Sequence, residues 1–142
     1  MSTGKLTTAD YPLAEQRPEL VQGPRGKPLA DITLDALVAG DVTIEDLRIT
    51  PRALEQQAEI ARAAGRPTLA ENFLRAGELV TVPQDVIMRI YELLRPGRAK
   101  DAAGLRAAAA ELRDKHGAAR MARFIEEAAD VYVKRGLFKK RF

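Results

Sequence analysis

From Thr33 onward, apolar residues recur at intervals of three and four, the spacing of helices that bury one face. Residues 67–80 are typical, because four of their apolar side chains fall four, three and four positions apart: Leu69, Phe73, Ala76 and Val80. Five main helices are predicted in this way, over residues 51–64, 67–80, 83–94, 101–115 and 118–135. No segment shows the alternating pattern of a strand, so the predicted fold class is all-α.

Capping residues predict where these helices begin and end. Thr33 and Thr43 can each cap a short helical turn, and Gly40 ends the first of them. Thr50 followed by Pro51 is typical of an N-cap and a first helical residue. The helix of residues 83–94 has the widest apolar face, and we predict that this face is the centre of the core. Its members are Val86, Ile87, Ile90, Tyr91 and Leu94.

Residues 1–31 differ from the rest, since they hold four of the eight prolines and three glycines together with several large apolar side chains. Proline prevents a continuous helix there, and a flexible linker would be poorer in apolar groups. The sequence therefore predicts an extended, proline-rich N-terminal arm over residues 1–31 that docks on its own body or on another chain. A compact helical bundle over residues 32–136 and a basic tail over residues 137–142 complete the predicted organisation.

The net charge of +3 depends on that tail. Five basic residues and no acidic ones lie between Lys134 and Phe142, so residues 1–133 carry a net charge of −2. A basic end of this kind is more often solubilising than nucleic-acid-binding. Phe138 and Phe142 alternate with the basic residues and could stack on bases, but two aromatics without a platform are a weak signal.

The residues that usually carry chemistry are almost absent. The chain has no cysteine and one histidine, His116, so we expect no metal site and no His-based catalysis in this chain. Residues 23–27 (GPRGK) lack the spacing of a phosphate loop and are interpreted as a turn. The adjacent carboxylates at 45–46 and 126–127 are interpreted as solvated groups or interface ion-pair partners. No apolar run is long enough to span a membrane, and we expect no secretory signal.

Residues 50–80 also satisfy a loose helix-turn-helix template. The second of these helices begins with few basic or amide side chains to reach base edges. A small nucleic-acid-binding regulator and a protein-interaction adaptor are the alternatives to the profile that the chain fits best, which is that of a subunit without a catalytic site.

Several ordered segments resemble the small (γ) subunit of adenosylcobalamin-dependent glycerol and propanediol dehydratases. Those near the N-terminus are residues 10–14 (DYPLA), 26–29 (GKPL), 31–34 (DITL) and 45–51 (EDLRITP). Later ones are residues 72–73 (NF), 82–83 (VP), 90–91 (IY) and 94–96 (LRP), with Phe124, Ala128 and Tyr132 near the end. The resemblance covers residues 10–135. The chain departs from the family pattern at Gly97 and in the alanine run of residues 107–110, which leaves the packing of that helix open.

The resemblance implies an α₂β₂γ₂ complex that converts a diol to an aldehyde and water by radical chemistry. Adenosylcobalamin would lie between the large and medium subunits, and this chain would bind no cofactor, nucleic acid or membrane and supply no catalytic residue. The complex would be cytoplasmic, and any packaging into a microcompartment would depend on the other subunits. The residues expected at the partner interface are Tyr11, Pro12, Leu13, Leu29, Arg48 and Ile49.

Overall fold

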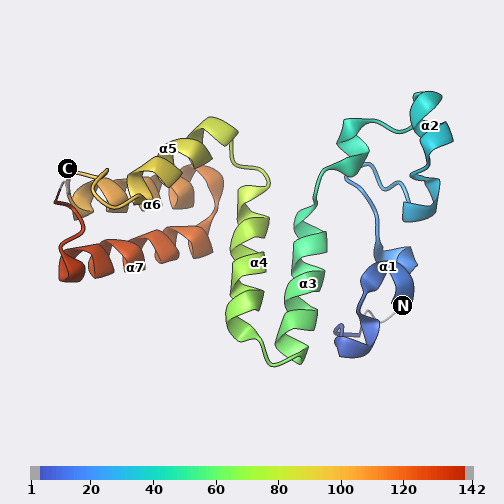
Figure 1. Cartoon of the computed structure of the whole chain (residues 1–142), viewed down its shortest axis with the longest axis horizontal. Coiled ribbons are helices and arrows are strands. Elements are labelled where there is room, and N and C mark those ends of the chain that lie inside the picture. Colours follow the sequence, from blue (N-terminus) through green and yellow to red (C-terminus); the bar gives the residue numbers. More distant parts are fainter. Residues whose placement is uncertain (1–3, 140–142) are drawn as a thin grey trace. The chain divides into compact units, whose positions relative to one another are not determined.

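The computed structural model describes residues 4–139, and the regular structure in that range is helical apart from one isolated bridge between Gln22 and Pro28 (Figure 1). The all-α prediction is confirmed. Contacts divide the chain into two units, Met1–Val80 and Thr81–Phe142. Among the described residues, five helices exceed ten residues in length; two lie in the first unit and three in the second.

The first unit is built on the helical hairpin of α3 (Pro51–Ala63) and α4 (Pro67–Leu79). The predicted cap of α3 is present, since Thr50 Oγ1 accepts the Ala53 N–H at 3.1 Å. Small side chains let the two helices approach closely, and larger ones of α4 pack around them. The buried alanines are Ala58, Ala61 and Ala70, and the surrounding side chains are Leu69, Phe73 and Leu74.

The proline-rich residues before this hairpin form four short helical turns, which are η1 (Thr8–Asp10), α1 (Leu13–Gln16), η2 (Pro18–Leu20) and η3 (Leu29–Asp31). Leu6 and Leu13 are buried against Ile60 of α3, and Leu20 and Val21 pack on the same cluster. The Leu6 N–H also donates to Glu59 Oε2 of α3 at 3.0 Å. The arm was expected to dock on its own body or on another chain. The structure shows that it docks on its own helix α3.

Two further turns connect the arm to α3: α2 (Leu34–Val38) and η4 (Ile44–Leu47). Both begin at a predicted capping residue. Thr33 Oγ1 accepts the Ala36 N–H at 3.1 Å, and Thr43 forms a capping box with Asp46. In the view of Figure 1, α2 lies at the right-hand edge of this unit, on the side of α3 that faces away from α4.

The second unit contains α5 (Gln84–Leu94), α6 (Ala102–His116) and α7 (Ala119–Arg135). Its fully buried large side chains are Leu105, Leu112 and Ile125, all on α6 and α7. The prediction that α5 carries the centre of the core is wrong, because only Ile90 of that helix is buried and Tyr91 is 58% exposed. The reason is that α6 and α7 pack mainly on each other, and alanines are among their buried side chains. These alanines are Ala108, Ala109, Ala122 and Ala129.

The end of the chain closes back on the loop after α5. The Gly97 N–H donates to the Leu137 carbonyl at 2.8 Å, and the Tyr132 hydroxyl donates to the Leu94 carbonyl. The ring of Phe138 packs on Tyr132 with 5.9 Å between centroids, so an intramolecular contact occupies it. The remaining tail residues of the prediction, from 140 to Phe142, lie outside the described residues. In the described part of the chain, no helix is both long and apolar enough to cross a bilayer.

Candidate partner interface

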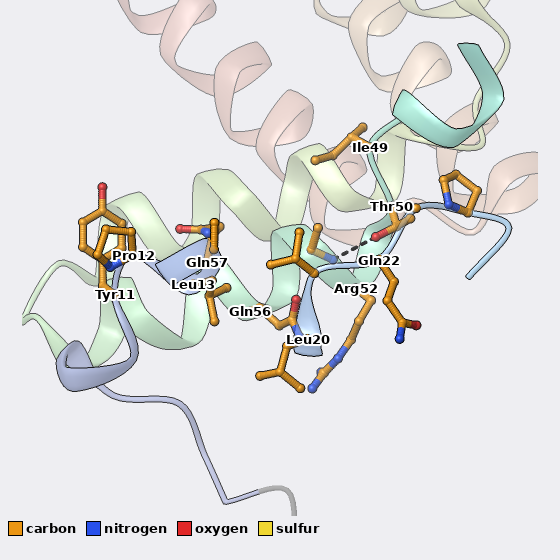
Figure 2. A pocket seen from close by; sticks show the side chains of 15 residues that line it. Tyr11, Pro12, Leu13, Leu20, Gln22, Ile49, Thr50, Arg52, Gln56 and Gln57 are labelled. Atoms are coloured by element: carbon orange, nitrogen blue, oxygen red, sulfur yellow. Dashed lines mark hydrogen bonds between the residues drawn. The ribbon is translucent and has the colours of Figure 1, made fainter. Parts of the chain in front are cut away.

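A groove of about 480 Å³ lies in the first unit between the N-terminal turns and α3 (Figure 2). We call it the arm groove. Figure 2 shows Tyr11 and Pro12 at one end and Ile49 and Thr50 at the other, with Gln56 of α3 between them. The residues that line it are Tyr11–Ala14, Leu20–Pro24, Ile49, Thr50, Arg52, Ala53, Gln56 and Gln57.

A second groove of about 280 Å³ continues from the first. The two share six lining residues, Val21, Gln22, Gly23, Ile49, Thr50 and Ala53. Leu29 and Arg48 lie in the second groove together with Leu47 of η4. The structure thus brings all six residues expected at the partner interface into one connected surface of the first unit.

These six residues differ in accessibility. Tyr11 is 60% exposed and Ile49 55% exposed, so both present apolar surface to solvent. Leu13 is only 6% exposed because it packs on Leu6 and Ile60, and its main contribution is therefore to hold the arm on α3. Arg48 is exposed and pairs with Glu45 at 3.0 Å.

Sequence reasoning did not assign the side of α3 that completes the arm groove. Ala53, Gln56 and Gln57 line it, and none of them is among the residues expected at the interface. A signal was present in Gln56 and Gln57, two adjacent amides with aliphatic stems. Such residues suit a surface that is partly buried and still needs hydrogen-bonding groups.

An ion pair between the half-exposed Arg25 and the buried Asp46 joins the arm to η4 next to the second groove. Arg25 Nε donates to Asp46 Oδ1 at 2.7 Å, and a second guanidinium nitrogen donates to Asp46 Oδ2. The Thr43 N–H donates to the same carboxylate at 2.9 Å. The Arg25 hydrogen bonds and then the Thr43 N–H lower the pKa of Asp46 to about 2, so its carboxylate is ionised at neutral pH.

The interpretation of residues 45–46 as solvated carboxylates or interface ion-pair partners is therefore wrong for Asp46, whose carboxylate is buried inside its own unit. Arg25 lies 21 positions earlier in the chain, so no local pattern shows the pair. The interpretation of residues 23–27 as a turn is confirmed, because the Gly26 N–H donates to the Gly23 carbonyl at 2.9 Å.

The backbone of this turn lies close to the backbone of η4 at Gly23. A Cβ built on Gly23 would overlap the Asp46 carbonyl oxygen and lie 3.2 Å from its carbon. We expect Gly23→Ala to destabilise the first unit by about 1–3 kcal/mol, because backbone must move to admit the methyl group. Urea unfolding of the purified chain measures the effect. Gly4→Ala is the matched control, since a Cβ there meets nothing within 4 Å, and equal losses for both variants would contradict the close approach.

The grooves hold little that could perform acid–base or metal chemistry. Among residues 4–139, no group of three or more His, Cys, Asp or Glu side chains is placed to hold a metal ion. His116 is the last residue of α6, in the second unit, and does not line either groove. What the arrangement offers is exposed apolar surface beside amide and guanidinium groups, which is the composition of a protein–protein contact.

Comparisons with known proteins agree with this description. A family model described as "Dehydratase small subunit" matches residues 6–139. A propanediol dehydratase small subunit of Citrobacter freundii is 48% identical over 138 residues, which cover 96% of this chain and 78% of the relative. A protein of the same name from Salmonella typhimurium is 46% identical over 131 residues, covering 92% of this chain and 75% of the relative. The chain therefore belongs to the family of dehydratase small subunits.

Proposed function

We propose that this chain is a non-catalytic subunit of an adenosylcobalamin-dependent diol dehydratase, needed for assembly of the complex, and that the arm groove and the groove next to it bind a larger subunit. Two relatives are named propanediol dehydratase small subunits, which supports a 1,2-diol as the substrate of the complex. The word "small" in the family description supports larger partner subunits. An α₂β₂γ₂ stoichiometry is part of the proposal.

The observation that carries this proposal is the exposed apolar surface at the two grooves. Tyr11, Leu29 and Ile49 are each at least 40% exposed, and they lie on the same connected surface. Contiguous apolar surface of this kind on a globular unit marks an interaction site. A partner that covers it gains the free energy of burying these side chains.

The residues of the grooves do not fit adenosylcobalamin. Their walls contribute no histidine, and the first groove, at about 480 Å³, is too small for a ligand with a corrin ring, a nucleotide arm and an adenosyl group. We therefore assign the cofactor to the large and medium subunits. We place the assembled complex in the cytoplasm, and we assign any packaging into a microcompartment to those same subunits.

The double substitution Tyr11→Ser and Ile49→Ser tests the groove as an assembly surface. Each removes an exposed apolar side chain worth about 1.5–3 kcal/mol when buried, so we expect at least a hundredfold weaker association with the larger subunits. The measurement is the amount of small subunit that co-purifies after co-expression with the large and medium subunits. Circular dichroism should show unchanged helix content, because both side chains are exposed.

Val133→Ser is a matched control, since Val133 is an exposed apolar residue on α7 of the second unit. It should co-purify at the wild-type level. The isolated chain should show neither dehydratase turnover nor cobalamin binding. Full co-purification of the Tyr11/Ile49 variant would rule out the groove as the contact, and turnover by the isolated chain would rule out a non-catalytic role.

A further inference from the structure

The segment between the arm and α3 exposes five large apolar side chains to solvent. We call residues 31–47 the α2 head. It contains α2 and η4, and Leu34 and Val38 of α2 are 73% and 81% exposed. Leu37, Ile44 and Leu47 are each at least half exposed as well. No residue of α2 is buried, so the helix does not gain its position by packing an apolar face on the rest of the unit.

Polar contacts hold the α2 head in place instead. The N–H groups of Asp41 and Val42 both donate to the Ala36 carbonyl, at 2.9 and 3.2 Å, which folds the chain back after α2. Lys27 Nζ donates to the Asp41 carbonyl at 2.6 Å, and the Arg25–Asp46 pair fixes η4. Val42 is the one buried apolar side chain of the α2 head. These contacts hold the backbone of the α2 head in place, while the leucine and valine side chains of α2 remain exposed to solvent.

The α2 head is also acidic. It contains five carboxylates, and no lysine or arginine lies between Lys27 and Arg48. Arg25 pairs with Asp46 and Arg48 pairs with Glu45. The other three, Asp31, Asp35 and Asp41, are exposed and have no ion-pair partner among residues 4–139. The surface of the α2 head thus combines exposed apolar side chains with three carboxylates that form no ion pair in the described part of the chain.

We infer that the α2 head is a second docking element, which inserts Leu34 and Val38 into an apolar groove rimmed by lysine and arginine side chains on a larger subunit of the complex. This inference rests on the proposed function. Charge complementarity defines the rim, since three carboxylates without an ion pair among the described residues, in the same short segment as the exposed apolar side chains, favour a cationic partner. Leu47 of the α2 head lines the second groove, so this element is continuous with the interface proposed above.

The apolar part is tested with Leu34→Ser and Val38→Ser together. Burial of each side chain is expected to tighten association about tenfold or more, so the double variant should associate about a hundredfold more weakly with the larger subunits. Both side chains are exposed, and helix content should not change. The measurement is the affinity of the purified variant for the co-expressed large and medium subunits, with Val133→Ser as the matched control on the second unit.

The acidic part is tested with Asp31→Asn and Asp41→Asn together. The amides keep the shape of the carboxylates and remove two charges. Association with the larger subunits should weaken at low salt, and its dependence on salt concentration should become shallower. Wild-type salt dependence in this variant would overturn the assignment of a cationic rim.

Three further outcomes are distinguishable. If the Tyr11/Ile49 variant fails to assemble while the Leu34/Val38 variant assembles at the wild-type level, the inference about the α2 head is overturned and the proposed function stands. If both variants assemble at the wild-type level, the inference about the α2 head is overturned and the arm groove is also ruled out as the contact. If the Leu34/Val38 variant assembles normally but abolishes self-association of the isolated chain, the occupant is a second copy and the inference is overturned.

Discussion

Leu112→Ala is expected to destabilise the Thr81–Phe142 unit by about 2–5 kcal/mol, one of the two largest effects on folding that we predict. Leu112 is among the fully buried large side chains of α6, and a close-packed interior relaxes only partly to fill the space that a shorter residue leaves. Thermal and urea unfolding of the purified chain measure the loss. Amide hydrogen exchange should place it in α6 and α7, with exchange in α3 and α4 unchanged.

Met88→Ala is the matched control for this prediction. Met88 lies on α5 and is half exposed, so its truncation should change the unfolding free energy by less than about 0.5 kcal/mol. A loss for Met88→Ala as large as that for Leu112→Ala would mean that α5 supplies the core of the second unit after all.

Leu6→Ala and Leu13→Ala together are expected to release the N-terminal turns from α3. Each leucine is buried against Ile60, and the loss for each is about 2–5 kcal/mol. The Leu6 N–H bond to Glu59 is a single contact and cannot hold the arm alone. We expect faster hydrogen exchange in residues 4–20, a lower unfolding temperature of the first unit and loss of the arm groove, so that association with the larger subunits also fails.

Leu34→Ala provides the comparison for the arm, because it truncates a leucine of the same unit that is exposed. Its effect on the unfolding temperature should be small. If the Leu6/Leu13 variant keeps slow exchange in residues 4–20, other contacts hold the arm, and the cluster around Ile60 is not what fixes it.

The helix boundaries could be predicted because their causes are local. Thr33 and Thr50 accept hydrogen bonds within three residues of themselves, and the glycines that end helices adopt positive φ angles, such as 71° at Gly65 and 67° at Gly117. Such signals depend only on residues close in sequence. The positions at which the helices begin and end therefore do not depend on what the helices pack against.

The centre of the core could not be predicted in the same way. An apolar face as wide as that of α5 indicates burial, but how much is buried depends on how closely other helices approach each other. Ala109 and Ala122 carry little apolar surface and yet are fully buried, on two helices that pack mainly on each other. A prediction based on the hydrophobicity of side chains ranks alanine low, and it therefore does not identify α6 and α7 as the core of the second unit.

The candidate interface was predicted in part. The resemblance supplied Tyr11, Leu29 and Ile49, and the structure places them on one surface. It did not distinguish Leu13, which is buried in its own unit, from the exposed neighbour Tyr11. A single family segment, residues 10–14, thus contains both a residue that packs inside its own unit and an exposed residue, and only the exposure of each side chain separates the two.

The ion pair between Arg25 and Asp46 closes a loop between residues that lie 21 positions apart in the chain. The backbone entropy of that closure is lost during folding, so it is not lost again when a larger subunit arrives. A partner therefore meets a preorganised surface and immobilises mainly side chains. Association should follow the kinetics of rigid docking, with rate constants of about 10⁵–10⁷ M⁻¹ s⁻¹, and not the slower course of binding coupled to folding.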